Sequence, residues 1–309
     1  MSGGAPPIDA LVETVRRSLA REYGIQASGV AAIDEQQRVY STTWVIEINA
    51  ADQKLRCILK WMRFGAARER ELAHVAREVF RNDPWVRTPR IACTPTPHTF
   101  LVEALPGRPL DATGAWLPSW RTSLRRAGTW LKRFHAATAN EEQVAGEGLL
   151  HYVRNRQRGL DALPVPLAER LLDGIAALPT HVGVRVHGDF TPHNVLVDGN
   201  GIAVLDQAGI EEFDRGSPWF DVACMMAGLE RTWRARSYNP LRRWDRPVDE
   251  AVGAFLDSYG ARGDEPELRV CRAVRYFTVV YTELLKKKAA PTVYAWAIEA
   301  LRSTLRDGE

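Results

Sequence analysis

The sequence lacks any long hydrophobic run, and its cysteines are few and far apart. No apolar stretch approaches the roughly 18 to 20 residues that span a bilayer, and the first residues, Met1–Pro7, lack the charged and apolar regions of a signal peptide. The four cysteines, Cys57, Cys93, Cys224 and Cys271, show no CxxC spacing, so neither a zinc cluster nor a disulfide framework is expected. We therefore expect a cytoplasmic protein with buried thiols.

Two common nucleotide-binding signatures are also absent. Neither GxGxxG nor GxxxxGK[ST] occurs in the chain, which excludes a Rossmann fingerprint and a Walker loop. Lysine is scarce, because only six of the 41 basic residues are lysine, so a lone lysine inside a strand is a candidate functional residue. The net charge of +3 is too small to indicate a nucleic acid partner.

The first third of the chain has the pattern of a small antiparallel sheet with two helices. Apolar residues recur at helical spacing in Ile8–Leu19 and Ala66–Phe80. The strand-like stretches are Gly29–Ile33, Thr43–Ile48, Leu55–Trp61, Pro89–Cys93 and Thr99–Glu103. The turn-forming Pro106-Gly107 follows the last of them, so we place a domain boundary there, between residues 1–105 and 106–309.

The rest of the chain has a mainly helical pattern, with one exception. The helical stretches are Pro118–Ala136, Glu141–Leu163, Pro166–Leu178, Trp219–Thr232, Val248–Tyr259, Glu265–Lys287 and Thr292–Leu305. In the exception, Val184–Ala208, two apolar runs are joined by Asp198-Gly199-Asn200-Gly201, which predicts a hairpin because Gly and Asn supply the positive φ values of tight turns. The 309 residues, 45% of them hydrophobic, are therefore predicted to form an α+β fold with two lobes.

The hairpin predicts a cluster of polar side chains at its open end. If Val197 pairs with Ile202, then Asn194 pairs with Leu205, one residue from Asp206. Asp189 lies just before the hairpin. We therefore expect the turn to gather two carboxylates and one amide at a single point.

Such a set suits phosphoryl transfer from a nucleotide. The reaction needs oxygen ligands for magnesium and a carboxylate that orients the attacking hydroxyl and accepts its proton. In protein kinases that Asp precedes the magnesium-binding Asn by five residues, which is the spacing of Asp189 and Asn194. The alternative is a hairpin whose Asp and Asn only cap turns. The spacing, the hairpin and the second carboxylate of Asp206 together favour a kinase-like site.

The residues around Asp189 also resemble a known family. His187-Gly188-Asp189 followed by Asn194 matches HGDxxxxN, the signature of the aminoglycoside phosphotransferase and choline kinase-like superfamily, and the resemblance extends across the chain. It implies a bilobal protein-kinase-like fold, with a small nucleotide-binding N-lobe and a larger, mainly helical C-lobe that carries the catalytic hairpin and binds the acceptor. It also implies that Asp189 is the catalytic base and that Asn194 and Asp206 hold Mg2+.

The resemblance extends to residues that support the catalytic loop. His187 opens the signature, and Gly216–Ala223 is similar to the start of a helix whose Asp, here Asp221, usually braces the loop. An acidic residue near a helix N-terminus is also favoured by the helix dipole, so this second explanation of Asp221 is equally consistent with the sequence.

One lysine is the candidate for phosphate binding. Lys60 lies in the apolar strand Leu55–Trp61, and a kinase-like lobe carries its phosphate-binding lysine on the third strand. A surface lysine is the alternative, which the apolar surroundings disfavour. Both Glu69 and Glu71 could pair with Lys60. At about 100° per residue, Glu69 lies nearer the centre of the apolar stripe of its helix, so we choose Glu69.

The remaining nucleotide contacts are inferred from the resemblance. Ser41 and Thr42 lie in the turn expected before the second strand, which resembles the Ser-rich nucleotide loop of the superfamily, although a plain hairpin turn is nearly as consistent with the sequence. Glu103 and Leu105 are similar to the interlobe hinge, whose backbone binds the nucleobase. Backbone contacts leave no side-chain signature, so the predicted cofactors are ATP or GTP, with Mg2+.

The acceptor is sought in the C-terminal helices. The stretch Glu230–Arg246 holds six arginines, the first of them Arg231, against only two acidic residues. If it faces the cleft, this stretch disfavours polycationic aminoglycosides and suits an anionic hydroxyl compound. A solvated arginine-rich loop explains the same composition equally well.

These patterns predict a small-molecule kinase that transfers the γ-phosphoryl group of ATP or GTP to a hydroxyl of a metabolite, sugar or antibiotic. The expected partner is a small-molecule acceptor, with no nucleic acid and no transmembrane segment. The alternative is a pseudokinase-like nucleotide-binding or scaffold protein, which Gln207 after Asp206 keeps open. A kinase that acts on protein is disfavoured, because the chain has neither an H-R-D loop nor a segment ending in APE.

Overall fold

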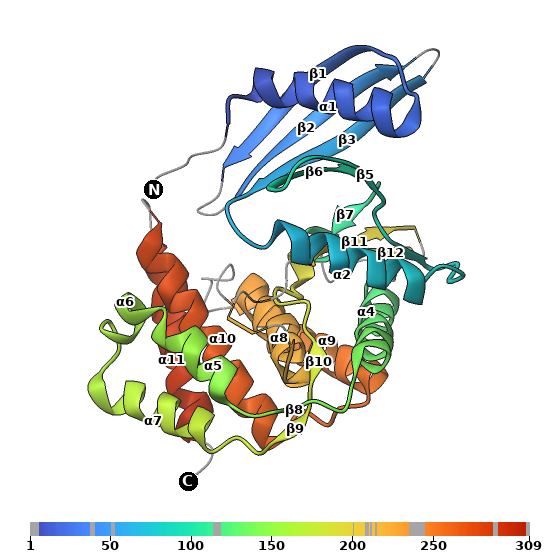
Figure 1. The fold of residues 1–309 in the computed structure, drawn as a ribbon. Coiled ribbons are helices and arrows are strands. Elements are labelled where there is room, and N and C mark those ends of the chain that lie inside the picture. The colour runs from blue at the N-terminus through green and yellow to red at the C-terminus, as the bar shows by residue number, and fades with distance from the viewer. Residues whose placement is uncertain are drawn as a thin grey trace. The chain divides into compact units, whose positions relative to one another are not determined.

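The structure, a computed structural model, describes residues 6–37, 41–50, 53–113, 119–199, 201–207, 210, 212–213, 215–234, 245–286 and 290–306 (Figure 1). The chain forms two compact units. The first comprises Met1–Pro106 and Ala203–Glu211, and the second comprises Gly107–Ile202 and Glu212–Glu309. The first unit is therefore discontinuous in sequence, which the sequence pattern does not indicate. Across the described residues, no helix is both long enough and apolar enough to cross a membrane.

The first unit is built on one antiparallel sheet. Its elements are α1 (Ile8–Tyr23), β1 (Ala27–Gln37), β2 (Ser41–Ala50), β3 (Gln53–Met62), α2 (Ala66–Val79), β4 (Val86–Arg87), β5 (Ile91–Thr96) and β6 (Thr99–Glu103). Five strands form a sheet in the order β1-β2-β3-β6-β5, and every neighbouring pair runs antiparallel. This is the antiparallel sheet with two helices that the sequence predicts.

Alternating burial places a hydrophobic core on one face of this sheet. Trp44 and Ile46 of β2 are buried at every second position, because successive side chains of a strand point to opposite faces. Val15 and Leu19 of α1 pack against them in the same cluster. Figure 1 shows α1 lying along the sheet. The amphipathic pattern of the first helix therefore serves to cover this face.

The second unit is mainly helical. Its helices are α3 (Leu110–Thr113), α4 (Ser119–Thr138), α5 (Glu147–Arg154), α6 (Gln157–Leu160), α7 (Val165–Ala176), η1 (Pro192–Asn194), α8 (Pro218–Arg234), α9 (Asp245–Tyr259), α10 (Pro266–Leu285) and α11 (Pro291–Arg306). Short strands lie between them: β7 (Arg108–Pro109), β8 (Gln143–Val144), β9 (His181–Val182), β10 (Val184–Arg185), β11 (Val195–Asp198) and β13 (Arg215–Gly216). β11 is followed by β12 (Gly201–Val204), its neighbour in a sheet, as the predicted hairpin requires.

An aromatic stack forms the base of the loop that carries Asp189. α4 packs against α9, and α10 packs against both α8 and α11 (Figure 1). Within this bundle the ring of Trp130 stacks on Phe190, with centroids 5.4 Å apart, and on Phe134, with centroids 5.0 Å apart. All three rings are buried. Because buried aromatic side chains contribute large contact areas, this stack gives the loop a rigid support.

The long helix predicted over Glu141–Leu163 is wrong. That stretch contains β8, α5 and α6 instead. Gly146 lies so close to the carbonyl of Ile175 that a Cβ would not fit there. Arg156 leaves the helical conformation at φ −108° and donates a hydrogen bond to the Tyr152 carbonyl at 2.7 Å. The first contact joins residues distant in the sequence, and helical periodicity cannot reveal such contacts.

The first two strands are longer than predicted. β1 extends to Gln37, and β2 begins at Ser41 rather than at Thr43. Gln37 is opposed to Thr42, so ladder pairing continues beyond the residues whose side-chain pattern marks the strands.

The four cysteines are free and buried, as expected from their spacing.

The contact between α4 and α9 yields a stability prediction. A Cβ at Gly128 would overlap Ser258 Oγ and the Phe255 carbonyl of α9. We expect Gly128→Ala to destabilise the protein by about 1 to 3 kcal/mol, the usual cost of overpacking, measured as a lower urea midpoint at an unchanged m-value.

Gly253→Ala on α9 is the matched control. A Cβ at Gly253 meets no atom within 4 Å, so alanine should raise stability by about 0.5 to 1 kcal/mol through its higher helix propensity. Equal midpoints for the two variants would contradict the close contact between α4 and α9.

Candidate functional site

A buried lysine in the first unit pairs with two acidic side chains. Lys60 Nζ on β3 donates to the two carboxylate oxygens of Glu69 at 2.9 and 2.7 Å and to Asp206 Oδ1 at 3.1 Å. The side chains of Lys60 and Glu69 are 9% and 8% exposed, and that of Asp206 is 33% exposed. The structure therefore pairs Lys60 with Glu69, the residue that the helical stripe favours over Glu71.

The register of the sheet explains why Lys60 reaches α2. Directly opposed residues of an antiparallel pair have their side chains on the same face. Lys60 is opposed to Thr43 on β2 and to Phe100 on β6, so it lies on the face that does not carry the α1 core. Ala66, the first residue of α2, packs beside Phe100 on that face. Glu69 in the first turn of α2 is thereby brought to Lys60.

The two carboxylates keep Lys60 charged. Burial alone would lower the pKa of the Lys60 ammonium, whereas Glu69 and then Asp206 raise it, and the resulting pKa lies above the ordinary value of 10.5. Lys60 is therefore a cation at any physiological pH. Its charge is available to an anionic ligand that joins or displaces one of the carboxylates.

Asp206 has a strained backbone. Its φ is 55°, and it is the one residue other than glycine with a positive φ in the described parts of the chain. A left-handed conformation costs a non-glycine residue about 1 to 3 kcal/mol, and such residues cluster at functional sites. The next residue, Gln207, is buried and donates to the Val204 carbonyl at 3.3 Å. This turn directs the Asp206 carboxylate to Lys60.

The two predicted hydroxyl residues, Ser41 and Thr42, lie on opposite faces of β2. Ser41 is opposed to Met62, two residues from Lys60 on the same strand, and therefore shares the face of Lys60. Thr42 is buried on the other face, with Trp44. Both residues are part of the strand rather than of a turn, which corrects the expected boundary. Residues 38–40, the rest of the expected loop, lie outside the described residues.

Two backbone N–H groups of the predicted hinge are already engaged. The Glu103 N–H donates to the Arg90 carbonyl at 2.9 Å, and the Ala104 N–H donates to the Arg56 carbonyl at 3.3 Å. β6 ends at Glu103, and Leu105 follows beyond the sheet. The Glu103 N–H is therefore engaged within the protein, and the nucleobase contact predicted for this residue would fall to its carbonyl.

In the second unit, one buried carboxylate holds the catalytic loop. Asp221 at the start of α8 is fully buried. Its Oδ2 accepts the His187 N–H at 2.7 Å, and its Oδ1 accepts the Gly188 N–H at 2.8 Å. Gly188 has φ 86°, which lets the chain turn here between His187 and Asp189. Asp221 thus contacts the loop directly, in addition to lying at a helix N-terminus.

A histidine that the sequence analysis does not single out completes this support. His135 of α4 bonds through Nε2 to Asp221 Oδ2 and through Nδ1 to the Tyr259 hydroxyl, both at 3.0 Å. Burial raises the pKa of Tyr259, as do Asp221 and Glu265, so its hydroxyl stays protonated. The signal for His135 is weak, because a histidine in the last turn of a helix is common and its partner lies 86 residues away.

Asp189 and Asn194 are held together across the loop. Asn194 Nδ2 donates to the Asp189 carbonyl at 2.9 Å and to Asp189 Oδ2 at 3.0 Å. Asn194 is buried, whereas the Asp189 side chain is 51% exposed. The amide nitrogen is thus engaged with Asp189, and Asn194 Oδ1 is the atom left to bind a cation.

An arginine that the sequence analysis does not identify fixes the second oxygen of Asp189. Arg275 Nη2 of α10 donates to Asp189 Oδ1 at 3.2 Å, and its side chain is 12% exposed. Burial alone would lower the pKa of Arg275, but its neighbours, among them the Asp189 carboxylate that accepts its hydrogen bond, raise it. Arg275 therefore remains a buried cation beside Asp189. Its position on α10 follows from tertiary packing, which no local motif encodes.

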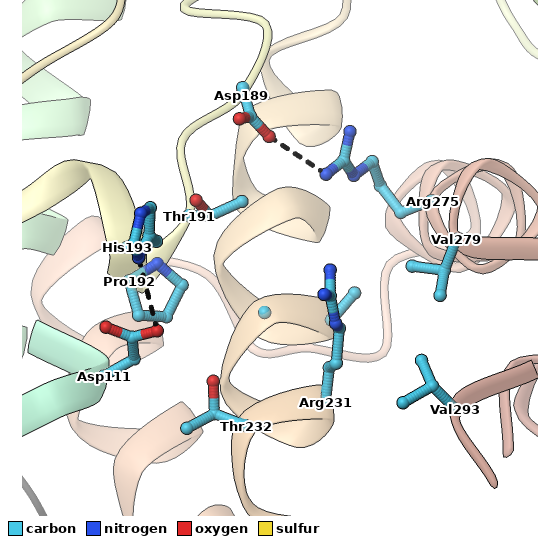
Figure 2. A pocket seen from close by; sticks show the side chains of 12 residues that line it. Asp111, Asp189, Thr191, Pro192, His193, Arg231, Thr232, Arg275, Val279 and Val293 are labelled. Carbon is cyan, nitrogen blue, oxygen red and sulfur yellow. Dashed lines mark hydrogen bonds and ion pairs between the residues drawn. The ribbon is translucent and has the colours of Figure 1, made fainter. Parts of the chain in front are cut away.

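A cavity of about 450 Å3 opens at Asp189 within the second unit (Figure 2). Its polar lining comprises Asp111, Asp189, Thr191, His193, Arg231, Thr232 and Arg275. Its apolar lining includes Ala227, Val279 and Val293. Cavities of this size and mixed lining bind small molecules.

Two residues offer oxygen donors that suit Mg2+. They are the Asp206 carboxylate and Asn194 Oδ1, and Mg2+ commonly uses one or two protein oxygens together with waters and substrate phosphates. No group of three His, Cys, Asp or Glu side chains that could hold a metal occurs among the residues that the structure describes. Asn194 belongs to the second unit and Asp206 to the first. Their predicted meeting at one point stays a prediction.

Solved phosphotransferases share this fold over nearly the whole chain. One is a glucosamine kinase in complex with glucosamine, ADP and inorganic phosphate (TM-score 0.62, 19% identity, 98% of this chain and 86% of that chain covered). Another is a thermostable mutant of aminoglycoside phosphotransferase APH(4)-Ia with AMP-PNP and hygromycin B (0.61, 15%, 96% and 98%). A third is choline kinase from Cryptosporidium parvum Iowa II (0.61, 10%, 98% and 97%). At such identities the similarity shows the fold, and it confirms the predicted kinase-like α+β architecture.

The sequence itself also matches a family. No curated protein sequence is similar enough to this chain to count as a match. The phosphotransferase enzyme family matches residues 40–270, which make up well over half of the chain and include Lys60, Asp189, Asn194 and Asp206. The resemblance carried by HGDxxxxN is thereby confirmed, and the chain belongs to the APH phosphotransferase enzyme family.

Proposed function

We propose that this protein is a magnesium-dependent small-molecule kinase that transfers the γ-phosphoryl group of ATP or GTP to a hydroxyl of an acceptor bound beside Asp189. The observation that carries the proposal is the state of Asp189. Asn194 and Arg275 hold its two carboxylate oxygens, yet half of the side chain stays exposed at a cavity of small-molecule size.

Asp189 is the proposed catalytic base. Its two hydrogen bonds fix the orientation of the carboxylate, and each carboxylate oxygen has a further lone pair for the acceptor hydroxyl. The hydroxyl donates to this carboxylate, which aims its oxygen at the phosphorus. Asp189 then takes the proton as the new P–O bond forms, while the bond from the γ-phosphorus to the bridging oxygen breaks and the nucleoside diphosphate leaves. Positioning of this kind is the main task of a residue in phosphoryl transfer.

Asn194 and Asp206 are the proposed magnesium ligands. Asn194 offers its Oδ1 because its amide nitrogen binds Asp189. Asp206 offers its carboxylate, which also accepts a hydrogen bond from Lys60. Bound magnesium would neutralise charge on the nucleotide phosphates. Asn194 thus links the proposed base and the proposed metal site, because its Nδ2 donates to Asp189 while its Oδ1 would bind the metal.

The first unit is the proposed nucleotide site. Lys60 is a buried cation held in place by Glu69, which suits it to bind a phosphate oxygen. Ser41 shares the face of Lys60 and is the better placed of the two predicted hydroxyls, whereas Thr42 lies on the opposite face. Glu103 and Leu105 would bind the nucleobase through backbone groups.

Removal of either carboxylate should stop turnover by different routes. We expect Asp189→Asn to lower kcat by about 100-fold or more, because the base is lost, while the thermal stabilisation by ATP and magnesium is retained. Asp206→Asn should lose both turnover and the magnesium dependence of that stabilisation. The measurements are product formation by mass spectrometry and the melting temperature.

Asp173→Asn is the matched control, since Asp173 is exposed on α7 in the second unit. It should leave kcat and nucleotide stabilisation unchanged. Full activity of Asp189→Asn would show that Asp189 is not the catalytic base. Nucleotide binding without product across a broad panel of hydroxyl compounds would favour the pseudokinase alternative.

Arg275 is predicted to act by positioning Asp189. Replacement by Gln removes the charged contact to Oδ1 and should lower kcat by about tenfold or more through misplacement of the base, with a smaller change in the KM for the nucleotide. Steady-state kinetics with the concentrations of both substrates varied would measure the change in kcat and the change in KM separately.

A purely structural role for Arg275 makes a different prediction. Arg275→Lys can still donate to Asp189 and should recover part of kcat, whereas a packing defect would lower the melting temperature of both variants alike. If Arg275→Gln and Arg275→Lys lose melting temperature and kcat to the same extent, Arg275 does not act by positioning Asp189.

A further inference from the structure

The walls of the cavity at Asp189 differ in how their charges are balanced. Asp189 accepts hydrogen bonds from Arg275 and Asn194. Asp111 lies 3.6 Å from His193 Nδ1. The Asp111 contact is an ion pair only when His193 is protonated, whereas Asp189 is paired with an arginine, a permanent cation.

Arg231 is the exception among the charged groups of the cavity. It is exposed on α8 and forms no ion pair with any side chain that the structure describes. Figure 2 shows its side chain extending from α8 toward the end of the cavity where Asp189 and Arg275 lie. Its positive charge thus lies at the cavity without an ion-pair partner among the described side chains. A guanidinium in this position suits a carboxylate or phosphate, which it can bind through two parallel hydrogen bonds.

The position of Arg231 relative to the catalytic loop is fixed by close packing. Gly228 lies one helical turn before Arg231, and a Cβ there would overlap Pro192 Cδ and lie 3.5 Å from Thr191 Cβ. α8 therefore approaches the loop at a distance that only glycine allows. Because residues three apart share a face of a helix, Arg231 faces the same space as Thr191.

The opposite wall is not suited to a polycation. Val279 and Val293 supply apolar surface, and Arg275 adds a second guanidinium near Asp189. A ligand with several amino groups would meet two arginines, one of them already paired with Asp189. Like charges brought together in this way reduce affinity.

We infer that the acceptor is a compact hydroxyl compound carrying one anionic group, a carboxylate or a phosphate, and that Arg231 determines this specificity. The inference rests on the proposed kinase function. The anionic group binds Arg231, and the cavity length between Arg231 and Asp189 selects the hydroxyl that reaches the base. Neutral and cationic analogues of the same size lack this contact.

The test compares acceptors that differ only in charge. On a hexose ring, the neutral probe is glucose, the anionic probes are glucuronic acid and glucose 6-phosphate, and the cationic probe is glucosamine. On a three-carbon chain, the probes are glycerol, glyceric acid and glycerol 3-phosphate. We expect the anionic members to have the highest kcat/KM, by about tenfold over the neutral ones, as a charge-assisted hydrogen bond implies.

Arg231 variants identify the residue responsible. Arg231→Ala should reduce the ratio of anionic to neutral kcat/KM by about tenfold, mainly through KM. Arg231→Glu should reverse the preference toward glucosamine. Arg125→Ala, which removes an exposed arginine of α4 that does not line the cavity, is the control and should leave the ratio unchanged. A wild-type preference for glucosamine, or an unchanged ratio in Arg231→Ala, would overturn the inference.

A binding measurement covers the case in which none of these probes is phosphorylated. Methyl phosphate, compared with sodium chloride at equal ionic strength, should raise the melting temperature of the wild type and of Arg125→Ala. The rise should be smaller in Arg231→Ala. No rise in the wild type, or equal rises in all three proteins, would overturn the inference.

Failure of the kinase function has a different signature. In that case no acceptor yields a magnesium-dependent product, while methyl phosphate still stabilises the protein through Arg231. Conversely, turnover of neutral or cationic acceptors in preference to anionic ones would leave the kinase function intact and reject the anionic acceptor.

Discussion

The buried carboxylate of Asp221 is the contact on which the catalytic loop depends. It accepts the backbone N–H groups of His187 and Gly188 and bonds to His135, with no exposure to solvent. A buried carboxylate is costly unless its hydrogen bonds are all made. The loop can therefore adopt few other conformations without leaving this charge unpaired. The orientation of Asp189, one residue beyond Gly188, follows from that constraint.

Several parts of the fold and of the candidate site could be predicted from the sequence, because they depend on local patterns. Helical periodicity located α1 and α2, and the hairpin signal located β11 and β12. Each of these patterns depends on residues within a few positions of one another. The pairing of Lys60 with Glu69 was also accessible, since it requires only a strand, a short turn and the first turn of a helix.

The remaining features depend on contacts between distant segments. Arg275 is 86 residues from Asp189, and the separation of His135 from Asp221 is the same. Neither has a local motif, because an arginine or histidine on a helix usually faces solvent or the core. The break in the helix predicted over Glu141–Leu163 arises partly from the approach of Gly146 to Ile175, which is also a tertiary contact. The composition of Glu230–Arg246 indicates an arginine-lined site, and among the described residues of this stretch Arg231 is the arginine that lines the cavity.

The discontinuity of the first unit limits how this fold can be divided. Ala203–Glu211 returns to the first unit after nearly a hundred residues of the second, and it brings the Asp206 carboxylate to Lys60. A fragment ending at Pro106 keeps Lys60 and Glu69 but lacks Asp206, the third charged side chain of their cluster. The unit that contains Lys60 is thus completed only after the loop with Asp189 has been synthesised. Recombination or gene truncation at the apparent boundary therefore cannot transfer this charge cluster as one continuous segment.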